Sequence, residues 1–209
     1  MSAGLGRRDL LGFRLRSRRA ADPSPGAGPR LGGDAGPPGG PDLGVGAEPG
    51  LDAGLVAFLQ SVELAAVAVY RSVLERDLLA GAALEVAASA AGHHDAHAAA
   101  FGRVAGVVDG RPNAAVLAEV GTGLEPDLAS GAALELLGSV ERRVAATHYQ
   151  VLGMLESPRA LDLAASVLPV EAQHVVALGL AGGVALEDVV PPLESTDGAL
   201  DPARYPVEA

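Results

Sequence analysis

Hydrophobic residues recur at helical spacing along four long stretches, and this pattern predicts helices over residues 52–76, 79–107, 130–155 and 158–180. Asp52 and Ser130 are suitable N-caps, and Pro158 suits the first position of the last helix. The first two helices are separated by almost no loop, so they are predicted to be antiparallel neighbours. A crossover of about twenty residues, containing DGRPN at 109–113 and one or two helical turns at 114–120, joins the two halves. The pattern therefore predicts an all-α bundle of four helices with one long crossover.

Each predicted helix carries ionisable side chains in the middle of its apolar stripe, where burial is costly unless a partner compensates it. These side chains are Glu63, His94 with His97, Glu141, and Glu171 with His174. Each lies 13 to 18 residues from the short turn of its hairpin, which is roughly 20–27 Å along the helix axis. We therefore expect six carboxylate and imidazole groups to converge at one level of an apolar interior.

Several neighbours of these residues are also predicted to matter. Tyr70 and His148 each follow a stripe glutamate by seven residues, so both should line the same interior and could orient a ligand or relay a proton or radical. His93 and Asp95 are expected to point outward. Pro169 removes one backbone hydrogen bond just before Glu171 and should kink the last helix.

A repeat relates the two halves of the chain. The sequence Ser-Val-Glu at 61–63, followed by Val-Leu at 73–74, recurs at 139–141 and 151–152, an offset of 78 residues. Ala-Ala-Ser at 87–89 precedes His97 by the interval at which the same triplet at 164–166 precedes His174, an offset of 77 residues. The two offsets indicate that two helical hairpins arose from one by internal duplication.

Composition narrows the chemistry that this interior could support. Of the 209 residues 49% are hydrophobic but only 3% aromatic, which suits close-packed helices with an Ala/Leu/Val core. The absence of cysteine excludes disulfides, thiolate catalysis and sulfur-ligated zinc or iron–sulfur sites. All fifteen basic residues are arginine, so Schiff-base chemistry and a P-loop lysine are excluded as well.

Charge is unevenly distributed along the chain. Residues 1–50 hold seven arginines and five acids, a charge of +2. Because the net charge of the whole chain is −11, residues 51–209 carry −13. A segment this acidic is a poor partner for nucleic acid but attracts cations.

The two ends of the chain differ from its body at residues 51–182. Residues 1–50 form an arginine-rich and then Pro/Gly-rich arm that is expected to be disordered. The segment from Arg7 to Leu11 resembles the opening of a twin-arginine export signal but lacks the apolar stretch that should follow. A cytoplasmic protein is therefore expected, with export as the alternative, and no uninterrupted apolar run predicts a membrane span. Residues 183–209 contain four prolines and are expected to form an extended surface tail.

Oxygen and imidazole ligands without sulfur suit iron, manganese or zinc. One Glu from each of two helices, with Glu-x-x-His from the other two, is the di-metal pattern of ferritin-like carboxylate proteins. Over roughly residues 52–180 the chain resembles this superfamily, and in particular bacterial ferritin-like domain proteins with a His-His-x-x-His segment and a Pro-rich ending, here GHHDAH and VVPPLESTDGALDPARYP. The resemblance implies a ferritin-like antiparallel four-helix bundle with Glu63, His97, Glu141, Glu171 and His174 as metal ligands.

His94 departs from this family pattern, because it occupies the position of a glutamate that bridges two metals. A neutral imidazole cannot bridge two ions through one nitrogen as a carboxylate can, so one tightly held ion, zinc for instance, an asymmetric pair, or no metal are the alternatives. Iron is the expected metal, with manganese or zinc as alternatives, and one or two ions are expected. The function implied is metal binding with iron or manganese redox chemistry, either ferrous iron oxidation or peroxide consumption. The alternative is a non-catalytic structural or interaction module; whether the chain is an enzyme, and whether it forms a homodimer, stay open.

Overall fold

The computed structural model describes residues 52–107, 109–121, 123–125, 127–190 and 195–207, and the N-terminal arm predicted for residues 1–50 lies outside them. The described residues form helices and contain no strand. The helices are α1 (Ala53–Glu75), α2 (Gly81–Ala105), α3 (Ala114–Gly121), α4 (Ser130–Leu152), α5 (Pro158–Ala181) and α6 (Leu186–Val189). The all-α class predicted from the sequence is confirmed, and the four long helices match the predicted ranges to within three residues at each end.

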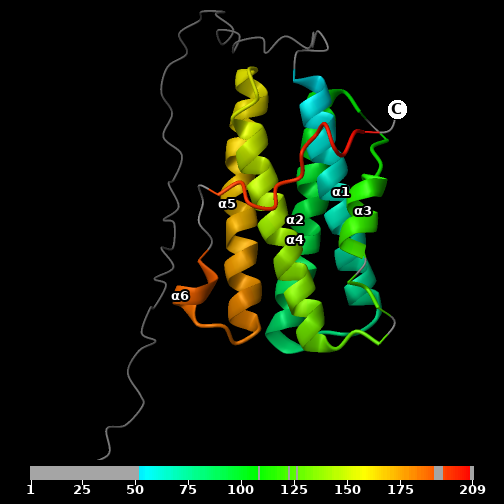
Figure 1. The fold of residues 1–209 in the computed structure, drawn as a ribbon, viewed down its shortest axis with the longest axis vertical. Helices are drawn as coiled ribbons and strands as arrows, with labels where there is room; N and C mark the ends of the chain where they lie inside the picture. Colours follow the sequence, from blue (N-terminus) through cyan, green and yellow to red (C-terminus); the bar gives the residue numbers. More distant parts are fainter. Residues whose placement is uncertain (1–51, 108, 122, 126, 191–194, 208–209) are drawn as a thin grey trace, which may run out of the picture. The chain divides into compact units, whose positions relative to one another are not determined.

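The four long helices lie side by side around a shared interior (Figure 1). Each helix contacts two others along its length, because α1 packs against α2 and α4, and α5 packs against α4 and α2. Figure 1 shows α1 and α5 running down the page and α2 and α4 running up it. The connection from α2 to α4 therefore returns along the length of the molecule, and it contains α3, which lies against α1.

The first helix is the most deeply placed of the four. It is apolar nearly all round, and thirteen of its 23 residues are buried, including Phe58, Leu59 and Val69. A helix without a polar face is expected to be covered on several sides, and α2, α3 and α4 all contact it. The interior side chains of α1 are consequently shielded from water. The backbone at the end of α2 favours glycine at position 102, since a Cβ there would lie 2.7 Å from the carbonyl oxygen of Val107.

Two helices, α1 and α5, are long and apolar enough to cross a membrane when judged by length and composition alone. The most apolar window of α1 is 67% buried within the structure, and that of α5 is 39% buried. Core helices of water-soluble proteins meet the same criterion, so this finding is weak, and the absence of a membrane span stays a prediction.

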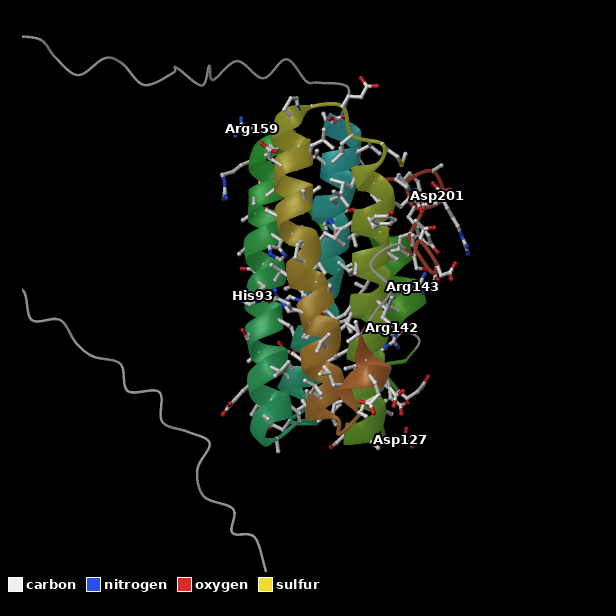
Figure 2. The ribbon with its side chains drawn as sticks, turned by 90° about the vertical axis from the view of Figure 1, so that its left-hand side faces the viewer. His93, Asp127, Arg142, Arg143, Arg159 and Asp201 are labelled. Carbon is white, nitrogen blue, oxygen red and sulfur yellow. The ribbon has the colours of Figure 1, made fainter. Side chains whose placement is uncertain are left out.

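The C-terminal segment is attached to the helices more firmly than the sequence suggested. Residues 186–189 form one helical turn, and Leu200 and Tyr205 are buried in the hydrophobic core rather than lying on the surface. The backbone N–H of Leu200 donates to the hydroxyl of Thr147, and the Asn113 side-chain amide donates to the carbonyl of Tyr205. Figure 2 shows the segment passing close to α4, near the labelled Arg143 and Asp201. The tail thus covers part of the core.

Asp52 was predicted to cap α1, but its carboxylate makes no capping hydrogen bond to that helix. It accepts instead from the backbone N–H groups of Glu156 and Ser157, at 3.1 and 2.6 Å, where α5 begins. A carboxylate at a helix N-terminus is favourable for the helix dipole. Ser130 likewise is the first helical residue of α4, and Ala129 takes the N-cap position.

We predict that Asp52→Ala lowers the free energy of unfolding by about 1–2 kcal/mol, because two backbone donors lose their acceptor. Denaturant titration of the metal-free protein measures this change. The matched control is Asp95→Ala, which removes an exposed carboxylate paired with an exposed arginine and should change stability by at most about 1 kcal/mol. Equal effects of the two substitutions would contradict the assigned role of Asp52.

Candidate metal centre

All four long helices contribute ionisable side chains to one buried cluster. Its three carboxylates have no exposed surface, and neither do two of its histidines. The members with zero exposure are Glu63 of α1, His94 of α2, Glu141 and His148 of α4, and Glu171 of α5. His97 of α2 and His174 of α5 complete the cluster, with side chains 15% and 7% exposed. The structure therefore brings together all six side chains that the sequence predicted to converge.

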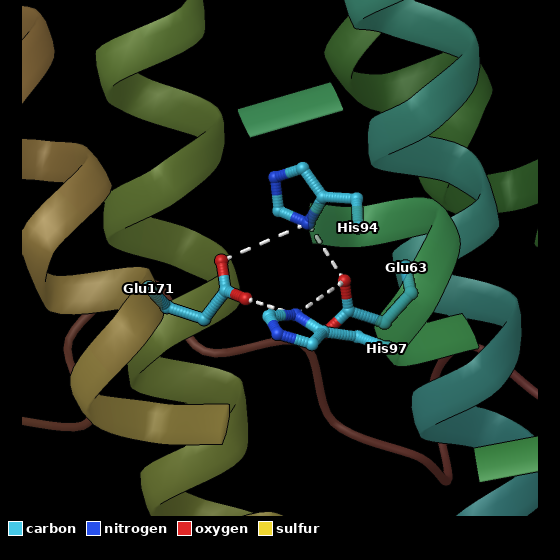
Figure 3. Close-up of side chains that lie close together, drawn as sticks. All are labelled: Glu63, His94, His97 and Glu171. Carbon is cyan, nitrogen blue, oxygen red and sulfur yellow. Dashed lines mark hydrogen bonds and ion pairs between the residues drawn. The ribbon is translucent and has the colours of Figure 1, made fainter. Parts of the chain in front are cut away.

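The first of two overlapping groups consists of Glu63, His94, His97 and Glu171, whose ligand atoms lie within 4.8 Å of one another. Figure 3 shows the two imidazoles and the two carboxylates alternating around a closed ring of contacts. The Nδ1 atom of His94 lies 2.6 Å from Oε2 of Glu63 and 3.7 Å from Oε2 of Glu171. The Nδ1 atom of His97 lies 2.8 Å from Oε1 of Glu171 and 3.8 Å from Oε2 of Glu63.

The second group consists of His94, Glu141, Glu171 and His174, again with ligand atoms within 4.8 Å of one another. The Nε2 atom of His94 lies 2.9 Å from Oε1 of Glu141. The Nδ1 atom of His174 lies 3.2 Å from Oε2 of Glu141 and 3.3 Å from Oε2 of Glu171. The two groups share His94 and Glu171, and the two ring nitrogens of His94 face a carboxylate of each group.

Two further side chains hold the carboxylates in place, as expected from their spacing along the helices. Tyr70 donates its hydroxyl hydrogen to Oε1 of Glu141. His148 lies with Nε2 2.7 Å from Oε1 of Glu63, and its ring stacks on Phe101. Tyr70 of α1 thus holds a carboxylate of α4, and His148 of α4 holds a carboxylate of α1. These two contacts fix the orientation of both carboxylates.

Opposite charges compensate the burial of this cluster. Burial alone would raise the pKa of Glu63, but hydrogen bonds from His148 and His94 hold it well below its usual value. Burial is likewise outweighed at Glu141, where the charge of His94 and a hydrogen bond from His174 lower the pKa. The same carboxylates raise the pKa of His94 well above normal against the effect of burial. In the metal-free cluster the charge of His94 is therefore balanced by the carboxylates of Glu63 and Glu141.

The pKa values of His97 and His174 follow the same balance. Burial would lower both, but Glu171 and Glu63 raise the pKa of His97 to about 9, and Glu141 and Glu171 raise that of His174 to about 9. Burial also acts on Tyr70, whose pKa rises well above 10 because its phenolate would lie beside the charge of Glu141.

One contact is close in distance but poorly aligned as a hydrogen bond. The Nδ1 atom of His97 and Oε1 of Glu171 are 2.8 Å apart, yet neither has a hydrogen-bond partner of suitable geometry in the described part of the chain. Both atoms are buried, so each carries an unused ligand position.

Two atoms bound to one ion at about 2.1 Å are at most about 4.2 Å apart. The ligand atoms of each group, all within 4.8 Å of one another, exceed this separation by at most about 0.6 Å, so small side-chain movements would bring them onto one ion.

His93 makes one contact that the sequence did not reveal. It is exposed, as expected, but its Nδ1 atom lies 2.9 Å from Nε2 of His174, and the two rings stack at 5.2 Å. The four-residue spacing of His93 and His97 indicated only that these two lie on neighbouring turns of one face of α2, and not that His93 contacts His174 of α5. Asp95 does point outward and pairs with Arg71.

The fold and the cluster together define an all-helical protein with a Glu/His group that could bind a metal ion. Comparison with known proteins does not assign the chain to a family. No family model matches it, and neither the curated proteins nor the solved structures include a significant match.

We predict that the metal-free protein loses stability as pH rises from 6.5 to above 9. The folded pKa values of His97 and His174, about 9, exceed the ordinary value of 6.5, so their stabilisation is complete below pH 6.5 and is lost as pH passes 9. Denaturant titrations in chelator across this range measure the effect. Because the chain has no lysine or cysteine, few other side chains titrate there.

The control for this pH dependence is the double variant His97→Gln/His174→Gln, whose stability should vary less over the same interval. An unchanged or rising stability of the original protein between pH 6.5 and 9 would contradict the pairing of these histidines with carboxylates.

Proposed function

We propose that the chain is a metal-binding protein of the ferritin-like kind, holding one or two ions inside its helices. The proposed ligands are the three carboxylates and three of the histidines: Glu63, Glu141, Glu171, His94, His97 and His174. The observation that carries the proposal is the pair of four-residue groups, each with all ligand atoms within 4.8 Å, that share His94 and Glu171.

The donor set favours particular metals. Carboxylate oxygens with imidazole nitrogens suit iron, manganese and zinc better than calcium or magnesium, which prefer oxygen alone. Iron is proposed first, with manganese and zinc as alternatives. Bound iron or manganese would supply a redox centre for ferrous iron oxidation or peroxide consumption.

The protein's own side chains would orient the ligands and exclude water. Tyr70 fixes one oxygen of Glu141, and His148 fixes one oxygen of Glu63, leaving the second oxygen of each carboxylate toward the histidines. His94 presents Nδ1 to the first group and Nε2 to the second. A single ion in one group would need His94 as a neutral imidazole, whereas an ion in each group would need it to lose both ring protons and bind as an imidazolate; stoichiometry decides between the two.

A ferritin-like bundle is the fold that best accounts for the helix arrangement. In support, each long helix contacts two others, and the long connection containing α3 returns along the molecule between α2 and α4. One long crossover between two helical hairpins is the feature that separates ferritin-like folds from simple up-down bundles.

A second candidate function has its own supporting observation. The three carboxylates are already paired with His94, His97 and His174, whose pKa values are raised, so the cluster is compensated without metal. A buried network of this kind could serve only to specify the packing of the helices. The chain would then be a structural or interaction module with a degenerate metal site.

We predict that Glu171→Gln lowers bound metal to near zero, because Glu171 belongs to both groups. The protein should be loaded with Fe²⁺ without oxygen, or with Mn²⁺ or Zn²⁺, and its metal content measured by elemental analysis after removal of free ions. The wild type should hold one or two ions per chain, while far-ultraviolet circular dichroism of the variant should remain helical.

Glu85→Gln is the matched control, since Glu85 is an exposed glutamate on α2 and its loss changes the net charge equally. It should retain the metal of the wild type. Equal metal content in wild type and Glu171→Gln would contradict the assigned site, and no metal in either would favour the structural module.

The redox part of the proposal has a separate prediction. Anaerobic wild type loaded with Fe²⁺ should oxidise it on addition of oxygen or peroxide at least about tenfold faster than Glu171→Gln at the same iron concentration. Stopped-flow absorbance of the ferric product measures the rates. Metal binding without any acceleration would leave the site as a metal-binding centre and remove the redox function.

A further inference from the structure

The buried cluster approaches solvent at one side, between α2 and α5. Its three carboxylates, His94 and His148 have no exposed surface, whereas the side chains of His97 and His174 are 15% and 7% exposed. Beside them His93 is exposed, and Figure 2 shows it on α2, about midway along the helices and next to α5. Among the described histidines, His93 is therefore the one that a cation in solution meets first.

His174 connects this exposed histidine to the buried carboxylates. Its Nδ1 atom faces inward, 3.2 Å from Glu141 and 3.3 Å from Glu171. Its Nε2 atom faces outward, 2.9 Å from Nδ1 of His93, and the two rings are nearly parallel at an interplanar angle of 14°. The second partner at this opening is His97, whose ring centroid lies 6.4 Å from that of His93.

The spacing of the two facing nitrogens fits a metal ion. Imidazole nitrogens bind zinc-sized ions at about 2.0–2.1 Å, so two nitrogens on adjacent positions of one ion lie about 2.9–3.4 Å apart. The observed 2.9 Å meets that range. Without metal, these two nitrogens share one hydrogen bond, which an arriving cation replaces.

We propose that His93 and His174 form an outer divalent-cation site through which metal ions exchange with the buried centre. This inference rests on the proposed metal-binding function and adds the route to it. A cation with affinity for imidazole binds between His93 and His174 and is then passed to His97 and Glu171. The pair selects borderline ions such as Fe²⁺, Co²⁺ and Zn²⁺ over Mg²⁺ and Ca²⁺.

A transit site changes rates in a way that an orienting hydrogen bond does not. A residue that only positions His174 stabilises the bound state, so its loss weakens affinity and accelerates metal release. A residue on the exchange route lowers the barrier in both directions, so its loss slows uptake and release by the same factor and leaves affinity unchanged.

The test follows Co²⁺ uptake by the metal-free full-length protein in a stopped-flow instrument, using the visible absorption of bound Co²⁺, and then its release to excess chelator. His93→Ala should slow both steps about tenfold while final Co²⁺ stoichiometry stays at the wild-type value. His93→Asp, which restores a ligand atom, should recover most of the rate. The matched control is Ser89→Ala, an exposed position one turn earlier on α2, which should behave as wild type.

Results other than these would overturn the exchange route, and one of them would also overturn the proposed function. Unchanged uptake and release in His93→Ala would overturn the exchange route while leaving the buried site intact. Faster release with weaker affinity would assign His93 a positioning role and overturn transit, and reduced stoichiometry would make it a ligand of the buried centre. Absence of Co²⁺ binding to the wild type would overturn the proposed function together with this route.

Discussion

The structure depends on the compensation of three carboxylates that have been removed from water. A buried carboxylate without a partner is so unfavourable that it would take up a proton or unfold its surroundings. Imidazole nitrogens lie within 2.6 to 3.3 Å of oxygens of Glu63, Glu141 and Glu171, and they hold the pKa values of Glu63 and Glu141 below normal. Since each long helix supplies part of this network, the charge balance also fixes how the four helices face one another.

This compensation explains why metal binding and a metal-free resting state are compatible. In the metal-free protein, protons on the histidines supply positive charge to the carboxylates. A divalent ion can take over that role when the histidines release their protons, because ligand nitrogens must be neutral. The proton and the metal thus compete for the same carboxylates and imidazoles.

Much of the fold and of the site could be predicted from the sequence because both depend on helical periodicity. Apolar spacing located α1, α2, α4 and α5 within a few residues, and distance from each hairpin turn placed Glu63 and Glu171 at one level. The same argument placed Tyr70 and His148 in this interior from their spacing to Glu63 and Glu141, and in the structure each bonds to the glutamate of the other helix.

The features that were missed depend on contacts between segments far apart in the chain. His93 was assigned outward because it lies off the apolar stripe of its own helix, and its contact with His174 requires the placement of α5. Asp52 looked like a local cap, but its partners lie more than a hundred residues later. Leu200 and Tyr205 sit in a proline-rich segment without periodicity, so no pattern indicated that they enter the core.

The most direct test of this account is the number of protons released when metal binds at pH 7. Calorimetric titration of the metal-free protein with Zn²⁺ or Fe²⁺, in buffers of different ionisation enthalpy, gives that number. The account predicts net proton release, because the raised pKa values of His94, His97 and His174 keep them protonated before binding and ligand nitrogens must be free of protons. Metal binding without proton release would contradict it, because the ion would then be held somewhere other than this network.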